Sequence, residues 1–298
     1  MVINPKSSVT STSPLGTTAN PQSDVEVRST KSIVKVRDGE TIVLGGLIPT
    51  VALEYAMKNT KVDYWVMGEG ERSFPKLLEE LSNDNLTPVG TSGLAYIHDE
   101  KQVISEVDFI SDLDSIPYPD YSNIVCGSNG EKASIIDYGN VMVKYAPGIM
   151  PRNYPYAVTI TSRGCPYKCI FCAGRTISGK KMRFRSSENV LREIDTLYSQ
   201  GIREIIFMDD HFLANRKRAL DIMNCLKEYP DLTWKCVNVC IWSLDKIILE
   251  IMYDSGCNFI VVSIESGDQW VLDNIIKKPV KLSNVPRILD LAKKIGFD

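Results

Sequence analysis

The chain has 298 residues, of which 44% are apolar and 24% are charged, a balance typical of a globular protein with one large or two modest domains. Its formal net charge of −3 provides no basic field for nucleic acid or an anionic membrane. No stretch reaches the roughly 18 apolar residues that cross a bilayer, and the polar N-terminus lacks the apolar run of a secretory signal. We therefore expect a cytoplasmic protein without a membrane span.

The first 48 residues differ in composition from the rest of the chain. Residues 1–24 are rich in Ser, Thr, Pro and Asn without periodicity, so we expect a disordered arm. Residues 25–48 alternate apolar and polar side chains around Asp38-Gly39, which predicts a β-hairpin because Asp-Gly favours the positive φ angles of a tight turn. We assign residues 1–44 to this arm and hairpin.

The stretch VRDGETIVLGGLI, within residues 25–48, also resembles the C-terminal part of a bacterial secretin. That resemblance would imply an exported protein of an outer-membrane assembly. The lack of a secretory signal opposes it.

Helical and strand patterns alternate after the hairpin. VALEYAMK and ERSFPKLLEELSND predict helices, and DYWVMG between them predicts a buried strand, an order typical of a parallel, doubly wound sheet. Short strands GLAYIH, QVISEV and ASIID follow, together with the Pro-rich DLDSIPYPDYS. We assign residues 45–115 to a partial Rossmann-like domain and residues 116–155 to a linker.

Residues 156–298 repeat a regular β/α pattern. Strands are predicted at YAVTIT, REIIFM, TWKCVNV and NFIVVSI, each followed by a helical segment. In the helix predicted over 187–200, Val190, Ile194 and Leu197 share one face, and Gly201 stands where a C-terminal cap belongs. Apolar strands alternating with helices predict an α/β fold, here part of a (β/α) barrel of the TIM type.

Three of the eight cysteines, Cys165, Cys169 and Cys172, directly follow the first strand of this series. Active-site groups of parallel β/α folds lie at the carboxyl ends of the strands, so the loop is placed for chemistry. Thiolates select iron–sulfur clusters or zinc, but a structural zinc site needs a second short ligand pair, which the sequence lacks at zinc-finger spacing. Three cysteines therefore favour a cubane cluster with one iron left open. Three unrelated buried cysteines are the alternative.

The pattern CxxxCxxC, with the aromatic Phe171 before its last cysteine, resembles the signature of the radical S-adenosylmethionine (SAM) superfamily. The resemblance implies an enzyme with a [4Fe–4S] cluster on the three cysteines and SAM on the open iron. The reduced cluster would cleave SAM to a 5′-deoxyadenosyl radical. It also implies a reductant such as flavodoxin or ferredoxin and a small-molecule substrate. Nothing in the sequence indicates nucleic acid.

Further stretches resemble superfamily elements in the same order. Arg183-Phe-Arg185-Ser186 resembles a basic element before the first helix. By resemblance, Asp209 and Asp210 contact the SAM amino group, Glu265 and Ser266 lie near the SAM ribose, and Phe171 joins the cofactor-binding residues. Helix capping or pairing with arginine is the alternative for these carboxylates. The sequence does not indicate a catalytic residue.

The remaining histidine and cysteine candidates have structural alternatives. His211 follows the aspartate pair, and we expect a histidine on a loop surface, with a substrate-side acid or base as the alternative. Cys236 and Cys240 are four residues apart in a predicted strand and so share a face. We expect both to pack in the core, with ligation of an auxiliary cluster as the alternative.

Gly45-Gly46 and Gly68-Glu69-Gly70-Glu71 resemble the final third of a cobalamin-binding domain that precedes a radical SAM barrel. Cobalamin is therefore a further cofactor that the resemblance implies, although the DxHxxG loop of such domains does not occur. The pattern is truncated at both ends relative to the family. Two functions stay open: radical SAM methyl transfer or rearrangement on an unidentified substrate, and a catalytically incomplete cluster-binding fragment or partner-dependent subunit.

Overall fold

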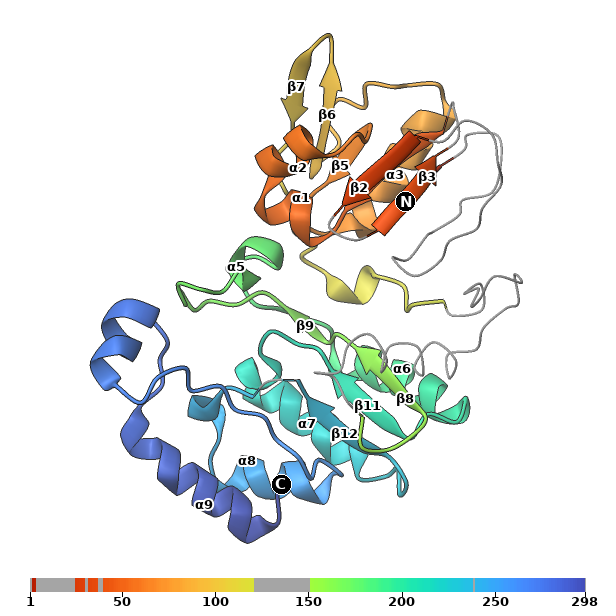
Figure 1. Ribbon diagram of the computed structural model, residues 1–298. Coiled ribbons are helices and arrows are strands. Elements are labelled where there is room, and N and C mark those ends of the chain that lie inside the picture. The colour runs from red at the N-terminus through yellow and green to blue at the C-terminus, as the bar shows by residue number, and fades with distance from the viewer. Residues whose placement is uncertain are drawn as a thin grey trace. The chain divides into compact units, whose positions relative to one another are not determined.

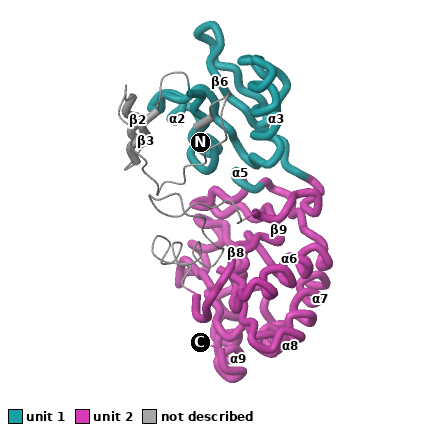
Figure 2. Tube along the Cα trace, turned by 90° about the vertical axis from the view of Figure 1, so that its right-hand side faces the viewer, with its two compact units in different colours: residues 1–110, 127–131, 176–178 teal, residues 111–126, 132–175, 179–298 magenta. Residues whose placement is uncertain are grey.

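The computed structural model describes residues 2–3, 25–29, 32–36, 40–120, 151–237 and 239–297 (Figure 1). The chain divides into two compact units (Figure 2). The first comprises residues 1–110, 127–131 and 176–178, and the second comprises residues 111–126, 132–175 and 179–298. Within the described part of the chain, no helix combines the length and apolar character that crossing a membrane requires.

The first unit contains strands and helices in the order β1 (Val2–Ile3), β2 (Val25–Ser29), β3 (Ser32–Val36), β4 (Thr41–Gly45), α1 (Leu47–Val51), α2 (Leu53–Asn59), β5 (Tyr64–Val66), α3 (Gly70–Ser82), β6 (Leu94–His98) and β7 (Lys101–Ile104). The remaining strands and α-helices are β8 (Tyr156–Thr159), β9 (Ser162–Arg163), α5 (Gly174–Ile177), β10 (Arg183–Phe184), α6 (Ser187–Ser199), β11 (Glu204–Phe207), α7 (Arg216–Leu226), β12 (Thr233–Cys236), α8 (Lys246–Asp254) and α9 (Val285–Ile295). Short 3-10 turns are η1 (Leu113–Ser115), η3 (Phe212–Ala214), η4 (Ile241–Ser243) and η6 (Leu282–Asn284), and η5 (Val271–Ile276) is a π-helical turn.

The first unit is built on a mixed sheet of strand order β1-β4-β5-β6-β7. β4 and β5 pair parallel, whereas the other neighbours pair antiparallel, so the wholly parallel sheet predicted for this part of the chain is wrong. β6 and β7 form a hairpin in which His98 pairs with Lys101. The two residues between them, Asp99 and Glu100, both have positive φ, as a type I′ turn requires.

The predicted hairpin around Asp38-Gly39 is wrong. β2 pairs with β3 in a separate two-stranded sheet in which Ser29 faces Ser32, while β4 joins the five-stranded sheet. Val43 is buried there, and this burial draws β4 to β5 instead of to β3. β1 pairs with β4, so part of the predicted disordered arm is a strand. The rest of that arm, residues 4–24, and the predicted strand ASIID lie outside the described residues.

The side chains of β5 point alternately to the two faces of the first unit's sheet, and both faces are covered by helices. Tyr64 and Val66 pack with Leu77 of the predicted helix α3 on one face. Trp65 and Met67 point to the other face, where they meet residues of α2. A strand with both faces buried explains why the segment DYWVMG reads as continuously apolar.

The second unit contains a parallel sheet of strand order β12-β11-β8, as the β/α pattern predicts. Helices α6, α7 and α8 follow these three strands in turn. Val190, Ile194 and Leu197 of α6 are buried as expected, and Gly201 has φ 94° just after the helix. The sheet is therefore part of a (β/α) fold whose strands end on one edge.

The fourth predicted strand, NFIVVSI, is not a strand in the structure. β12 ends at Cys236 and the chain bends at Val237, so no regular ladder continues. Two backbone bonds still connect this part of the chain to the β12 region: Trp234 N donates at 3.3 Å to the carbonyl of Gly256, two residues before the segment, and Val239 N donates to Val261 O, within it, at 2.9 Å.

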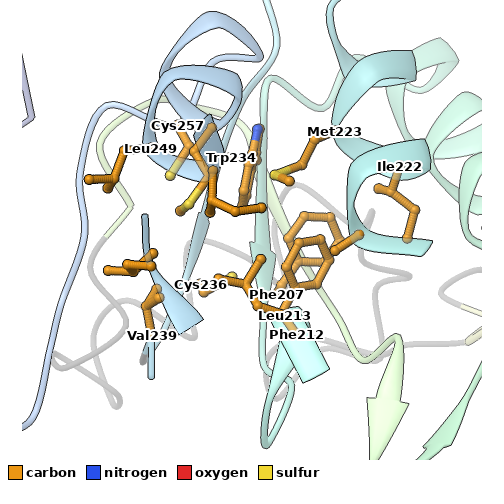
Figure 3. Packing of buried hydrophobic residues seen from close by; sticks show 14 of the residues in the cluster. Phe207, Phe212, Leu213, Ile222, Met223, Trp234, Cys236, Val239, Leu249 and Cys257 are labelled. Carbon is orange, nitrogen blue, oxygen red and sulfur yellow. The ribbon is translucent and has the colours of Figure 1, made fainter. Parts of the chain in front are cut away.

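An aromatic group fills the core of the second unit (Figure 3). The rings of Phe207 and Phe212 stack with centroids 4.8 Å apart, and Trp234 lies 5.5 Å from Phe207. Ile222 of α7 and Leu249 of α8 belong to the same cluster and lie on opposite sides of this group (Figure 3). The rigid core fixes the strand ends from which the candidate site is built.

Candidate functional site

The cysteine loop, residues 165–172, lies between β9 and α5, shortly after the end of β8. Gly164 has φ 95°, and its N–H donates to a carboxylate oxygen of Asp210 at 3.0 Å. The N–H of Cys165 donates to Gly179 O at 3.1 Å, and that of Cys172 donates to Cys169 O at 3.1 Å. The loop thus begins at the carboxyl edge of the parallel sheet, where the sequence places it.

The three thiols of this loop interact electrostatically. Cys165 and Cys169 are half-buried and Cys172 is exposed, and none is in a disulfide. Burial raises the pKa of the Cys165 and Cys169 thiols, and the nearby Cys172 raises the pKa of both further. The N–H of Gly174 donates a hydrogen bond to Cys172 Sγ at 3.4 Å. Three free thiols on one loop, supplied with a backbone donor, form a ligand set that fits an iron–sulfur cluster.

A cluster and a single ion need different arrangements of ligands. Among the residues that the structure describes, no three His, Cys, Asp or Glu side chains converge closely enough to share one metal ion. A [4Fe–4S] cluster is larger than a single ion and would take each thiolate on a different iron, so its three ligands can stand farther apart. The loop therefore fits a cubane as a donor set.

Contacts from later segments fasten the loop. Trp242 Nε1 donates to Tyr167 Oη at 2.8 Å, and Ile170 N donates to Ile276 O at 3.0 Å. Phe171 stays 59% exposed despite its apolar ring. The backbone of the loop is held by protein contacts, while its second half presents an exposed surface.

The two adjacent aspartates at the end of β11 differ in environment. Asp209 is buried and accepts hydrogen bonds from Thr161 N (2.7 Å), Thr161 Oγ1 (2.6 Å) and Ser162 Oγ (2.6 Å). Burial raises the pKa of the Asp209 carboxyl, and these hydrogen bonds oppose the rise. Asp210 is half-buried and holds Gly164. Asp209 fixes the end of β8, and Asp210 fixes the start of the cysteine loop.

Glu265 and Ser266 lie after the extended segment that was predicted as the fourth strand. Glu265 has a left-handed backbone, with φ 75°, and its carboxylate lies 2.9 Å from Lys278 Nζ. Ser266 Oγ accepts a hydrogen bond from Asp268 N at 3.1 Å. Lys278 was not predicted as a site residue, because a lysine beside Lys277 in a polar segment carries no signal of burial.

The arginine of the RxRS stretch is part of a buried network. Arg185 Nη1 lies 2.6 Å from Glu193 Oε2, and its Nε donates to Asn189 Oδ1 at 2.7 Å. Arg218, which no sequence motif indicated, donates from Nη2 to Thr161 O at 2.9 Å. Arg185 also donates to Ile160 O, so both arginines bond to the backbone just after β8 and hold it in position.

The prediction of a surface position for His211 is wrong. Its side chain is buried, and its Nε2 lies 3.3 Å from Ser243 Oγ. Its ring centroid lies 5.9 Å from that of Tyr167. Burial lowers the pKa of the His211 imidazole, because the charged form loses water. The large ring of Trp242 in the same cluster, with its centroid 6.4 Å away, covers a position that the sequence presents as a loop.

Cys236 and Cys240 do not share a strand. Cys236 is buried as the last residue of β12, whereas Cys240 is half-buried before η4. Burial raises the pKa of Cys240 to about 12, and Cys165 and Cys169 add to this. Cys240 therefore lies near the cysteine loop, which the prediction of core packing did not anticipate.

Comparisons with known proteins agree with this geometry. The model of the radical SAM superfamily matches residues 159–298. An uncharacterized methyltransferase of Pyrococcus horikoshii is 31% identical over 290 residues, which cover 95% of this chain and 58% of that protein. The cytidylyl-2-hydroxyethylphosphonate methyltransferase of Streptomyces wedmorensis is 27% identical and covers 85% of this chain and 50% of that protein. The chain thus spans little more than half the length of these relatives.

Two solved structures share the fold. The radical SAM methyltransferase TsrM from Kitasatospora setae, with cobalamin and a [4Fe–4S] cluster bound, has a TM-score of 0.66 and 16% identity, over 86% of this chain and 49% of that one. The cobalamin-dependent radical SAM enzyme OxsB has a TM-score of 0.67 and 18% identity, over 86% of this chain and 35% of that one. The α/β fold predicted from the sequence is confirmed.

Proposed function

This chain belongs to the radical SAM superfamily, and on that premise we propose that Cys165, Cys169 and Cys172 hold a [4Fe–4S] cluster with which the protein cleaves SAM. When bound and reduced, such a cluster supplies the electron that breaks a carbon–sulfur bond of SAM and starts radical chemistry. The observation that carries the proposal is the three-thiol loop at the carboxyl edge of the parallel sheet.

We infer separate roles for the residues around the loop. Phe171, Asp210, Glu265 and Ser266 are candidates for contact with SAM, because each has exposed or half-buried surface on the cysteine loop, at the end of β11 or after the extended segment 258–264. Asp209 acts indirectly, by positioning the backbone of the site without contacting SAM. Both of its oxygens are occupied by Thr161 and Ser162, so it holds the strand end in place.

We propose methyl transfer as the reaction, with cobalamin as a further cofactor held by the first unit. The relatives named above are methyltransferases, and two structures of this fold contain cobalamin. Beside Gly46, which has φ 91° and open space where a Cβ would stand, α1 and α2 expose apolar side chains. These are Leu47, Ile48, Val51 and Tyr55. An exposed apolar surface after a glycine pair suits a broad, flat ligand.

A small-molecule substrate and a one-electron donor of the flavodoxin or ferredoxin class complete the proposal. We propose the cytoplasm as the compartment, because a reducing environment keeps the seven described cysteines as free thiols. The alternative, a cluster-binding subunit that depends on a partner for turnover, is the other outcome of the test below.

The test is anaerobic cluster reconstitution followed by reduction with dithionite in the presence of SAM, with or without hydroxocobalamin. We expect a bound cluster and formation of 5′-deoxyadenosine or S-adenosylhomocysteine. Cys169→Ala should abolish both, while Cys225→Ala, which removes an exposed cysteine of α7 outside the loop, should retain them. A cluster without either product supports the partner-dependent alternative. Absence of a cluster in the wild type contradicts the proposal.

A further inference from the structure

The segment after η5 is attached to the cysteine loop and carries a buried ammonium. Ile276 O accepts the hydrogen bond from Ile170 N, inside the loop, and Lys278 follows two residues later. The backbone N–H of Lys278 donates to Leu272 O at 3.1 Å, and its carbonyl accepts from Val280 N at 2.9 Å. The position of Lys278 relative to the loop is therefore fixed through the main chain.

The Lys278 side chain is fixed as well. Only 8% of it is exposed, and Nζ donates to Ser263 O at 2.5 Å and to Glu265 Oε1 at 2.9 Å. A buried ammonium is costly unless it is paired and hydrogen-bonded, so these two acceptors explain how the protein tolerates it. The Glu265 partner remains 33% exposed, so solvent screens the carboxylate more than the ammonium.

The segment that carries Lys278 reaches the cysteine loop beside Cys169. The bond from Ile170 N to Ile276 O attaches this segment at the residue that follows Cys169, and Lys278 lies two residues further along. The Lys278 ammonium also opposes the rise that burial causes in the pKa of the Cys169 thiol. A positive charge that is buried and fixed therefore lies beside the loop.

Building on the proposed function, we propose that the Lys278 ammonium stabilises the reduced state of a [4Fe–4S] cluster on this loop and thereby raises its reduction potential. In the reduction step, a low-potential donor of the flavodoxin or ferredoxin class loses one electron and the cluster gains it. The net charge of the cluster thereby becomes more negative by one. A fixed, buried positive charge favours that added charge. The charge and hydrogen bonding around a cluster are established determinants of its potential.

The test replaces the charge and measures the potential of the full-length, reconstituted protein by redox titration followed with electron paramagnetic resonance. Lys278→Gln removes the charge and keeps a donor for Ser263 and Glu265, Lys278→Met removes both, and Lys278→Arg keeps the charge. Lys281→Met is the matched control, since Lys281 is 61% exposed and pairs with Asp273. At the wild-type midpoint, both neutral variants should show a reduced-to-oxidised ratio about tenfold lower, which corresponds to about 59 mV for one electron.

The outcomes separate the two proposals. Lower potentials in Lys278→Gln and Lys278→Met, with Lys278→Arg and Lys281→Met near wild type, support the inference. Full cluster loading with unchanged potentials overturns the inference and leaves the proposed function standing. A wild type without a cluster overturns both. If neither neutral variant folds, Glu265→Gln decides: it removes the opposing charge, and failure to raise the potential overturns the inference.

Discussion

The indole of Trp242 donates a hydrogen bond to the hydroxyl of Tyr167 at 2.8 Å, and their rings meet edge to face with centroids 5.0 Å apart. Tyr167 lies between the first two cysteines of the loop, and Trp242 lies in η4, the turn that follows β12. The Trp242 side chain thus connects the cysteine loop, which follows β8, to the turn after β12 at the opposite edge of the sheet.

Trp242→Phe removes the N–H donor and keeps an aromatic ring. We expect the free energy of unfolding to fall by about 1–2 kcal/mol, because the half-buried Tyr167 hydroxyl loses its partner and some packing is lost. Iron bound per chain after reconstitution should fall as well. Urea unfolding and iron analysis measure the two effects. Trp270→Phe is the control, since Trp270 is 63% exposed, and equal losses in both variants would contradict the prediction.

Asp209→Ala leaves several buried donors of the β8 end without an acceptor. The Thr161 N–H and the hydroxyls of Thr161 and Ser162 all lose their partner, so we expect a loss of roughly 3 kcal/mol in the free energy of unfolding. Chemical denaturation followed by circular dichroism measures it. Asp221→Ala, on the exposed side of α7, should change stability by less than about 0.5 kcal/mol. An equally mild Asp209→Ala would show that water replaces the carboxylate.

Gly256→Ala and Gly201→Ala separate steric clash from backbone strain. Both glycines have left-handed backbones, with φ 98° and φ 94°. A Cβ at Gly256 would stand 2.7 Å from Leu232 O, whereas one at Gly201 would meet nothing within 4 Å. We expect Gly201→Ala to cost about 1 kcal/mol from strain alone, and Gly256→Ala clearly more. Thermal unfolding of the two variants side by side makes the comparison, and equal losses would rule out the clash.

His211→Phe should change how stability depends on pH. Because burial lowers the pKa of His211 below 6.5, the unfolded chain takes up a proton below that pH while the folded chain does not. The His211 contribution to the free energy of unfolding is therefore present above about pH 6.5 and is lost as pH falls toward the folded pKa. Urea titrations at about pH 7.5 and about pH 5.5 should show a wild-type advantage over His211→Phe that shrinks at the lower pH. A constant difference would contradict the burial of a neutral ring.

Local signals in the sequence predicted local structure well. Ser186 caps α6 by accepting a hydrogen bond from Asn189 N, and Gly201 follows the end of the helix. The residues at and next to its two ends therefore predict where this helix begins and ends. The position of the cysteine loop was also predictable, because it depends only on which strand precedes it. The roles proposed for its residues stay predictions.

Non-local pairing was the part that the sequence could not supply. β4 could be read as the second half of a hairpin, and only the buried contacts of Val43 with β5 decide otherwise. His211 and Lys278 likewise look like surface residues in the sequence. For His211 the reason is that the side chains that bury it, including Trp242, lie tens of residues away along the chain. Burial of a polar side chain is a property of the folded neighbourhood and leaves no periodic trace.

The segment that fails to become a fourth strand has a protective consequence. Residues 256–261, which lead into it and form its first half, bond twice to the β12 region, from Trp234 N to Gly256 O and from Val239 N to Val261 O, without forming a ladder. Unpaired strand edges are templates for association between molecules, and a covering segment blunts them. Loosening residues 256–261, for example through Gly256, should therefore promote aggregation at high protein concentration before it unfolds the core.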